Sequence, residues 1–297
     1  MKNITSIDPN SISISELHQI LLTAVAPRPI AFASTVDIKG NVNLSPFSFF
    51  NVFSANPPIL IFSPARRVRD NTIKHTLANV KATKEVVINI VNYPIVEQMS
   101  LSSTEYGKDV NEFEKAGLTE VNSIMVKPPR VAESPVSFEC VVENIIELGN
   151  QGGAGNLVVS RVVNIHINNK YLGKNGKLDT EKLDLVARMG GSLYTRVTDQ
   201  SLFEIPKPIF TKGIGVDQLP KHVFNSDILS GNNIGRLGNC EQLPTNEEVM
   251  VYKKSPTLRV IINTPNEALQ IAEIHKLAKT YIDNNEMELA LKTIFCA

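Results

Sequence analysis

The chain has 297 residues, 42% of them hydrophobic, and its 30 basic and 30 acidic side chains give a formal net charge of zero. That length and apolar content suffice for one large domain or two smaller ones, and the balanced charge excludes the basic surface of a general nucleic-acid or membrane-surface binder. No stretch approaches the roughly 18 apolar residues of a membrane span, and the opening MKNITSIDPN lacks the apolar core of a signal peptide. We therefore expect neither membrane insertion nor export.

The three cysteines, Cys140, Cys240 and Cys296, show no Cys-x-x-Cys or Cys/His spacing. An odd number without such spacing argues against a disulfide framework and against a zinc site. The sequence therefore predicts a cytoplasmic protein without a bound metal.

Strand and turn signals follow one another from residue 30 to residue 63. The stretches IAFASTV, VNLSPFSFFNVF and ILIFS are predicted strands, and DIKGN and NPP are the turns between them. Together they predict a meander of antiparallel strands. The period then changes, with Ile73, Leu77 and Val80 at i, i+4 and i+7 and no Gly or Pro nearby. That spacing predicts a helix over residues 70–84.

The next segment, residues 85–167, returns to strands separated by short helices. EVVINIV is a predicted strand, and PIVEQMS and NEFEKAG are predicted short helices, the second ended by Gly117. Two longer strands, SFECVVENIIEL and NLVVSRVVNIHI, flank the loop GNQGGAGN, which predicts a wide hairpin. Several strands with only short helices predict a mainly β protein, either a closed barrel or a sandwich.

The C-terminal third has a different composition. Residues 206–244 are rich in Gly, Pro and Asn with irregularly spaced apolar residues, and we expect an ordered arm that wraps over a surface. The run TPNE predicts a helix start, with Thr264 as the cap, Pro265 as the first helical residue and Glu267 completing a capping box. A helical apolar stripe follows, and MELALKTI predicts one more short helix.

Basic residues gather in SPARRVRDNT, residues 63–72, just before the first predicted helix. Free backbone N–H groups and the positive end of a helix dipole favour an anion there, and a phosphate is the expected ligand. In the alternative interpretation, Asp70 or Asn71 merely caps the helix and the arginines form a solvated rim. The residues available to a phosphate are Arg66, Arg67, Arg69, Asn71, Thr72 and Lys74.

The stretch NLSPFSFFNVFS places serines between phenylalanines. We expect a turn at residues 44–46 that brings Ser45 and Ser48 to one end of the barrel. There their hydroxyl groups can bond a flat polar ring while Phe47 or Phe49 lies against it. The alternative is that the phenylalanines are core residues and the serines serve the turn.

Histidines offer no catalytic arrangement at the sequence level. His166 lies on the polar side of its predicted strand with Ser160 and Asn164, where a half-exposed strand histidine is the simpler interpretation. Neither a catalytic triad nor a metal site has ligands at the spacings found here. The sequence therefore predicts no catalytic side chain. The other histidines are His18, His75, His222 and His275.

The run PRPIAFASTVDIKGNVNLSPFSFFNVFSANPPILIFSPARRVRDNTIKHTLANVKATKEVVINIV closely resembles the flavin reductase-like, FMN-binding split-barrel family. That family includes flavoredoxins and the reductase components of two-component monooxygenases. EYGKDVNEFEKAGLT, PPRVAESPVSFEC and ARMGGSLY extend the resemblance over roughly residues 15–195. It implies a mainly β fold, a Greek-key split β-barrel with short helices, in residues 1–200, and a C-terminal extension ending in helices in residues 201–297. It also implies a homodimer that binds one FMN per subunit near the interface.

The resemblance further implies which residues hold FMN. Along the isoalloxazine ring and the ribityl chain they are Ser45, Pro46, Ser48, Ser63 and Ala65. At the phosphate they are Arg69, Asn71, Thr72 and Lys74, in agreement with the anion site predicted from the residues themselves. Arg28 in PRP and Asn89 in VVINIV are further candidates, although a lone arginine commonly forms a surface ion pair.

By the same resemblance the chain is expected to be an FMN-dependent oxidoreductase that passes electrons from NAD(P)H to free flavin, a partner monooxygenase or another acceptor. Many nicotinamide-using members carry Gly-Asp-His at the hairpin where this chain has GNQGGAGN, a loop that also lacks dinucleotide-binding spacing. Two alternatives to an NAD(P)H-dependent reductase therefore stay open. One is a flavoredoxin-like electron carrier with little NAD(P)H activity, and the other is a non-catalytic flavin-binding module.

Overall fold

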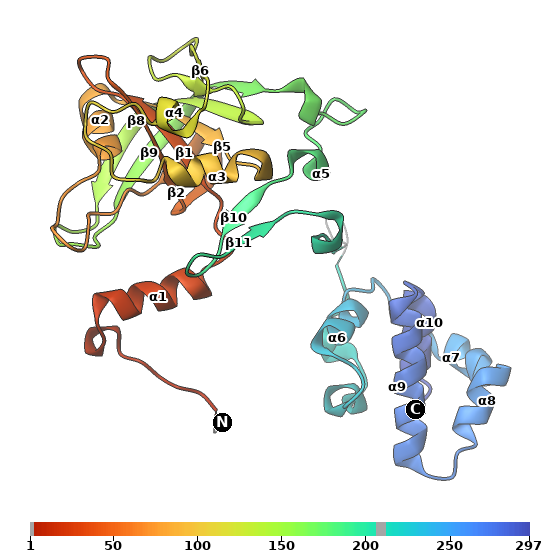
Figure 1. Ribbon diagram of the computed structural model, residues 1–297. Coiled ribbons are helices and arrows are strands. Elements are labelled where there is room, and N and C mark those ends of the chain that lie inside the picture. The colour runs from red at the N-terminus through yellow and green to blue at the C-terminus, as the bar shows by residue number, and fades with distance from the viewer. Residues whose placement is uncertain (1–2, 206–211) are drawn as a thin grey trace. The chain divides into compact units, whose positions relative to one another are not determined.

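The computed structural model describes residues 3–205 and 212–297. The chain forms two compact units, residues 1–203 and residues 204–297. The first is built around an antiparallel sheet, and the second contains helices but no strand among its described residues (Figure 1). No helix in the described part of the chain is both long and apolar enough to cross a membrane.

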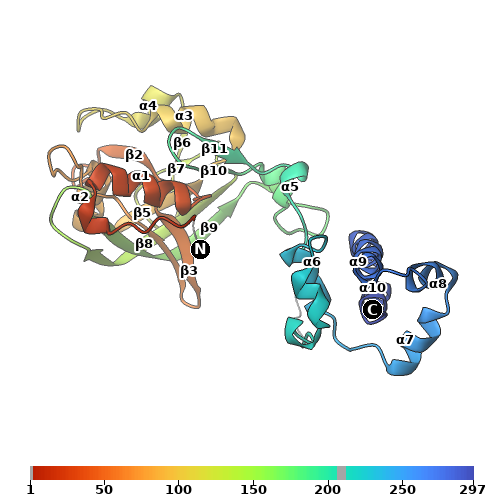
Figure 2. The same cartoon turned by 90° about the horizontal axis from the view of Figure 1, so that it is seen from below.

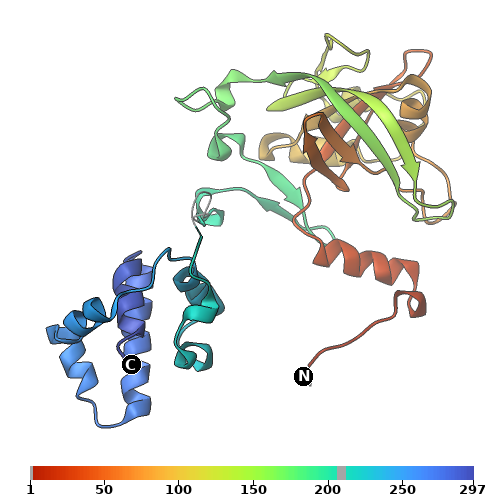
Figure 3. The same ribbon diagram turned by 180° about the vertical axis from the view of Figure 1, so that it is seen from behind.

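Seven strands form the main sheet of the first unit, in the order β2-β1-β5-β8-β9-β4-β3. Every neighbouring pair is antiparallel. The long hairpin of β8 and β9, visible in Figure 3, confirms the one predicted around GNQGGAGN. The strands are β1 (Ala31–Val36), β2 (Val42–Phe47), β3 (Phe50–Ala55), β4 (Pro58–Phe62), β5 (Glu85–Ile90), β8 (Val136–Glu147) and β9 (Asn156–Ile167).

The two edge strands of this sheet, β2 and β3, are consecutive in the sequence. Only Ser48 and Phe49 separate them, so the sheet has to curl until its edges lie near each other. In the part of the chain that the structure describes, no backbone ladder joins β2 to β3. Instead, the rings of Phe47 and Phe62 pack with their centroids 5.4 Å apart. The predicted continuous meander is therefore wrong, and residues 44–46 lie inside β2 rather than in a turn.

Side chains on both faces of the sheet build a core. The inner core includes Phe62, one of the two rings that close the barrel. The outer core includes Phe32 and Leu44 and is covered by α3 (Val96–Leu101) and α4 (Glu112–Ala116), which lie near β2 in Figure 1. Because strand β1 is covered on both faces, all six of its residues are buried, and its sequence AFASTV lacks charged residues altogether.

Helix α2 (His75–Thr83) begins at His75, five residues later than the predicted start at Asp70. Oδ1 of Asp70 accepts hydrogen bonds from the Thr72 N–H, at 3.0 Å, and from the Thr72 hydroxyl, at 2.6 Å. Asn71, between them, adopts the left-handed conformation with φ of 57°. A carboxylate that bonds two residues ahead competes with helix formation, and residues 70–72 therefore form a turn.

Helix α1 (Ile14–Ala24) was not predicted, although its start carries a sequence signal. The Ser13 hydroxyl accepts a hydrogen bond from the Glu16 N–H at 3.1 Å, and the spacing Ser-x-x-Glu is typical of a helix start. Helix α4 ends at Gly117, as predicted, and this glycine adopts the left-handed conformation with φ of 63°. The remaining elements of this unit are α5 (Thr180–Leu183), β6 (Glu120–Val121), β7 (Arg130–Val131), β10 (Val186–Arg188) and β11 (Tyr194–Arg196).

The second unit packs its helices around a core of its own. Leu219, Val223 and Leu237 meet Ala278 and Ile282 there, and Figure 2 shows α9 and α10 side by side. The prediction of a surface arm is wrong for its described part, because that part supplies core residues; residues 206–211 lie outside the described residues. The helices are α6 (Gly231–Gly238), α7 (Asn246–Lys253), α8 (Pro256–Ile262), α9 (Glu267–Asp283) and α10 (Met287–Ile294).

Helix α9 begins two residues later than the run TPNE predicts. Its cap is Asn266, whose Oδ1 accepts a hydrogen bond from the Leu269 N–H at 3.0 Å. Thr264 therefore lies outside the helix, because Asn266 provides an equally good capping group nearer to the apolar stripe. Ile274 and Ala278 of that stripe are buried, and the final predicted helix is confirmed as α10.

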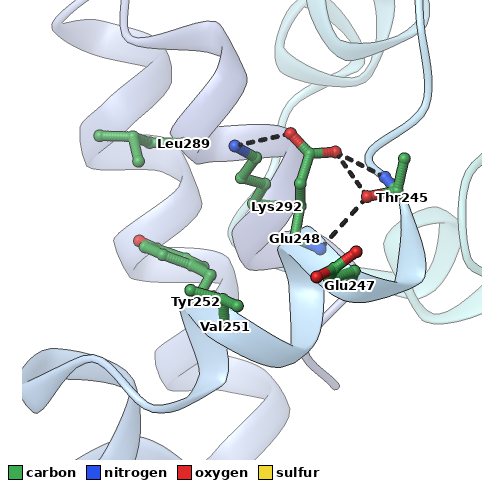
Figure 4. A pocket seen from close by; sticks show the side chains of 7 residues that line it. All are labelled: Thr245, Glu247, Glu248, Val251, Tyr252, Leu289 and Lys292. Carbon is green, nitrogen blue, oxygen red and sulfur yellow. Dashed lines mark hydrogen bonds and ion pairs between the residues drawn. The ribbon is translucent and has the colours of Figure 1, made fainter.

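A cavity of about 380 Å³ lies between α7 and α10. Figure 4 shows that its polar groups bond to one another: the Glu248 carboxylate accepts hydrogen bonds from the Thr245 N–H and hydroxyl, at 2.8 and 2.9 Å, and pairs with Lys292 at 3.2 Å. These contacts cap α7 and tie it to α10. We assign no ligand to this cavity, because its one cation, Lys292, is already paired with Glu248 and Glu288.

Candidate functional site

Two loops of the first unit pack against each other where the basic residues gather. We call them the basic loop, residues 63–74, and the hairpin loop, residues 148–155. Arg66 exchanges two backbone hydrogen bonds with the hairpin loop, at 2.8 and 3.0 Å. The side-chain amide of Asn71 donates to a backbone carbonyl of that loop at 2.9 Å. The hairpin loop therefore supports the basic loop from one side.

Gly152 explains why the hairpin loop is rich in glycine. A Cβ atom at this position would lie 2.9 Å from the Val68 carbonyl oxygen and 3.0 Å from the Arg67 carbonyl oxygen. Because both are backbone atoms, a larger residue would push the two loops apart. The glycine allows this close approach, which is a scaffolding role for GNQGGAGN.

Two of the predicted phosphate ligands, Asn71 and Thr72, use their side chains to shape the basic loop. Asn71 Oδ1 accepts from the Arg66 guanidinium at 2.6 Å, and its backbone carbonyl accepts from the same group at 2.7 Å. The Thr72 hydroxyl and N–H both donate to Asp70, and these hydrogen bonds, with that from Arg69, hold the pKa of Asp70 at about 2. Both predicted residues therefore lie in the site, with their polar groups already paired.

The carboxylate of Glu105 joins two arginines of the basic loop. It accepts from Arg67 at 2.7 Å and also pairs with Arg69, which is 67% exposed. These hydrogen bonds lower the pKa of Glu105. Sequence reasoning missed Glu105, because no local pattern links it to a loop more than 30 residues earlier. It occupies the donors that a phosphate would need.

Lys74 differs from the arginines in having no carboxylate partner among the described residues. Its ammonium group lies 5.0 Å from the centroid of the Phe47 ring, at the cap of α2. Burial and the nearby Arg67 lower the pKa of Lys74. Because no side chain caps α2, the free N–H groups of its first turn add to the positive potential there. This is the strongest anion-binding feature of the loop.

The serines of the predicted ring wall lie at the break between β2 and β3. Ser45 and Pro46 belong to β2, Ser48 lies in the connection that follows, and all three are half-buried. Ser63 is buried, and its hydroxyl accepts a hydrogen bond from the Asn156 N–H at 3.0 Å, which joins β4 to β9. The Lys74 ammonium lies over the ring of Phe47, the residue just before Ser48, so this wall and the basic loop meet at that ring. The remaining predicted residue, Ala65, is half-buried in the basic loop.

The two further candidates, Arg28 and Asn89, have structural partners. The Arg28 guanidinium donates to the carbonyls of Leu22, Val25 and Met189, the last two at 2.8 and 2.9 Å. The guanidinium also contacts the Ser48 hydroxyl at 3.5 Å, so Arg28 helps to position the serine wall. Asn89, in β5, is fully buried.

The amide of Asn89 is used entirely within the protein. It donates to the Phe32 carbonyl at 3.0 Å and accepts from the Val131 N–H at 3.0 Å and the Ser137 hydroxyl at 2.7 Å. These bonds account for a polar residue in the sheet without a ligand.

Comparison with known proteins agrees with the architecture. The family model described as "Flavin reductase like domain" matches residues 24–181. An uncharacterized protein of Halalkalibacterium halodurans is 38% identical over 208 residues, which cover 69% of this chain and 98% of that protein. The family match lies within the first unit, in the part of the sequence that contains the basic loop and the serine wall.

Solved structures give the same result. Nitrilotriacetate monooxygenase component B from Bacillus cereus superposes with a TM-score of 0.64 at 29% identity, covering 69% of this chain and all of that one. A Shewanella frigidimarina protein assigned as a flavin reductase with a split barrel domain gives a TM-score of 0.56 at 26% identity, covering 67% of this chain and 95% of that one. The predicted fold class is confirmed, and the chain belongs to the flavin reductase-like split-barrel family.

Proposed function

We propose that this protein binds FMN and acts as an FMN-dependent oxidoreductase that passes electrons from NAD(P)H to free flavin or to a partner monooxygenase. The observation that carries the proposal is Lys74, a half-buried cation without a carboxylate partner among the described residues, placed over Phe47 between the basic loop and the serine wall. A phosphate on one side and a polar ring on the other suit that position. The three free cysteines agree with a cytoplasmic location.

The residues divide the work of holding FMN. Lys74, Arg67 and Arg69 neutralise the phosphate, and the half-buried hydroxyls of Ser45 and Ser48 bond the ring edge or the ribityl chain. When bound, FMN supplies the electron-transfer chemistry itself. The protein therefore needs to bind and orient the cofactor and limit the access of water, and no acid–base pair is required at this site.

An anaerobic titration of the FMN-loaded protein tests the electron donor. We expect NADH or NADPH to bleach the flavin absorbance within seconds. Slow bleaching by both nicotinamides, together with rapid reduction by a protein donor, would support the flavoredoxin-like carrier instead, and the absence of Gly-Asp-His from the hairpin loop favours that second candidate. A bound flavin that no donor reduces would support the non-catalytic module.

Glu105 should compete with FMN for the arginines. Glu105→Gln removes the charge that engages Arg67 and Arg69, and we expect the FMN dissociation constant to fall by about 1.4- to fivefold, since exposed ion pairs contribute roughly 0.2–1 kcal/mol. Fluorescence quenching of FMN measures the change. Glu143→Gln, which breaks the surface pair with Arg161, is the matched control and should leave the constant unchanged. An unchanged or higher constant in Glu105→Gln would contradict the competition.

We propose a homodimer as the working assembly. Val52 and Phe53 on the edge strand β3 are each 63% exposed, and Leu193 is 69% exposed, so large apolar side chains face outward from this unit. Light scattering of the purified protein should give twice the 32.7 kDa chain mass, and Phe53→Glu should shift it to the monomer. A wild-type monomer at micromolar concentration would refute this assembly.

A further inference from the structure

A second polar site lies on the outer face of the sheet, at the end of the β8–β9 hairpin opposite to the hairpin loop. Asn89, Ser137 and His166 stand in one row across β5, β8 and β9, because the strand registers pair Asn89 with Ser137 and Ser137 with His166. Glu139 and Asn164 pair in the next row on the same face. The proposed FMN site uses none of the hydroxyl or imidazole groups in these rows.

Glu139 organises this face. Its buried carboxylate accepts from the N–H groups of Ile124, Met125 and Val126, at 2.9, 2.5 and 3.2 Å. It also bonds Nε2 of His166 at 2.5 Å. Although burial alone would raise it, these hydrogen bonds hold the pKa of Glu139 at about 2.

An ionised carboxylate can only accept hydrogen bonds, so it fixes a hydrogen on Nε2 of His166. Glu139 thereby orients the imidazole, and its hydrogen bonds to backbone N–H groups also hold the segment of residues 122–127 against the sheet.

A cavity of about 480 Å³ lies beside these rows, and His166 and Ser137 line it together with Arg130 and Ser134. That volume falls in the range of roughly 300–1,000 Å³ that is typical of small-molecule sites. Its walls also include the apolar side chains of Val121, Val131 and Ile167. The cavity can therefore hold a compact molecule with a short carbon body.

Two polar groups on its wall lack adequate partners. The Arg130 guanidinium contacts only the Asn122 carbonyl, at 3.2 and 3.4 Å, and pairs with no carboxylate among the described residues. The hydroxyl of Ser134, a residue only 5% exposed, has no hydrogen-bond partner in the described structure. A buried hydroxyl left unpaired costs about 1–3 kcal/mol, and a ligand that accepts from both groups would relieve that cost.

We propose that this cavity binds a small organic carboxylate, held by the Arg130 guanidinium and the Ser134 hydroxyl. The planar fork of a guanidinium matches a carboxylate in two parallel hydrogen bonds. The wall offers one arginine and no lysine, which suits a singly charged group better than a doubly charged phosphate. We call this cavity the Arg130 pocket.

Calorimetric titration of the full chain, saturated with FMN so that the basic loop is occupied, tests the proposal with acetate, succinate and benzoate as probes. We expect saturable 1:1 binding of at least one of them. Arg130→Gln should weaken that binding at least tenfold and Arg130→Lys by less. Arg161→Gln, which removes an arginine of β9 that already pairs with Glu143, should leave it unchanged. Because FMN occupancy is read from flavin absorbance, failure of the proposed function and failure of this site are distinguishable.

Ser134→Ala separates a ligand role from a structural one. Because the hydroxyl has no partner in the described part of the chain, its removal should leave the melting temperature unchanged or raise it, while weakening carboxylate binding at least threefold. Absence of saturable binding for all three probes, or equal affinity in wild type and Arg130→Gln, would overturn the proposal. Tighter binding of glycerol phosphate than of any carboxylate would overturn the choice of ligand class.

Discussion

Lys74→Met should weaken FMN binding by about 10- to 100-fold, since a hydrogen bond to a charged group contributes roughly 1.5–3 kcal/mol. Lys74 is half-buried over Phe47 and has no carboxylate partner among the described residues. Its ammonium group is therefore available to a phosphate without breaking an existing ion pair, and methionine keeps the apolar length of the side chain. Equilibrium dialysis with absorbance detection of FMN measures the loss.

Other cations near the site serve as controls for this result. Lys81→Met, on the same helix, removes an ammonium group that pairs with Glu147 at 2.5 Å, and its FMN affinity should stay within twofold of wild type. Arg69→Ala combined with Thr72→Ala should have a smaller effect than Lys74→Met, because Arg69 is 67% exposed and Thr72 is bonded to Asp70. If Lys74→Met binds FMN as tightly as Lys81→Met, the phosphate lies elsewhere.

The second unit should lose stability as the pH falls from 6.5 towards 4. Nδ1 of His222 and Nε2 of His275 lie 2.8 Å apart, with stacked rings. Burial, and then the charge of His222, lower the pKa of His275 to about 4, and burial lowers the pKa of His222. The pair was missed in the sequence because the two histidines are 53 residues apart.

The direction of the effect follows from proton uptake on unfolding. Both pKa values are lowered in the folded state, so the unfolded chain binds more protons below pH 6.5. The stabilisation is complete above the unfolded value and is lost as the pH approaches 4. For His275 alone, which is 3% exposed, a shift from 6.5 to about 4 corresponds to about 3 kcal/mol.

Urea unfolding followed by circular dichroism at the helix band measures this loss at pH 7.5 and pH 4.5. His275→Gln keeps an amide that can donate to His222 but cannot titrate, and it should remove most of the pH dependence. His18→Gln, at an exposed histidine of α1, is the control and should retain it. Parallel pH profiles for wild type and His275→Gln would show that other groups cause the loss.

Elements with local signals could be predicted from the sequence. The alternating stretches around GNQGGAGN form the β8–β9 hairpin, Gly117 ends α4, and MELALKTI forms α10. The predicted starts of α2 and α9 were wrong because neighbouring side chains compete for the same backbone N–H groups. Asp70 bonds to Thr72 and delays α2, and Asn266 caps α9 in place of Thr264.

Topology needed more than local signals. The strand VNLSPFSFFNVF is broken at Ser48 because its two halves pair with different partners at opposite edges of the sheet. Residues 212–244 read as an irregular arm, since their apolar spacing has no clear period, yet they supply Leu219, Val223 and Leu237 to a helical core. Their partners lie on α9 and α10, beyond the reach of any local window.

The sequence by itself determined the family and its split barrel through the resemblance of its motifs, and it determined the mainly β class and the basic stretch before α2 because period, turn residues and charge runs depend on neighbours a few positions apart. Only the tertiary structure decided which polar groups have partners. The Asn71 amide is bonded to the hairpin loop, and Arg67 is paired with Glu105. Among the described residues, Lys74 has no carboxylate partner and the Ser134 hydroxyl has no hydrogen-bond partner. Whether a charge or hydroxyl is available to a ligand depends on residues that folding brings from far along the chain, and this is why the candidate sites emerge only from the contacts.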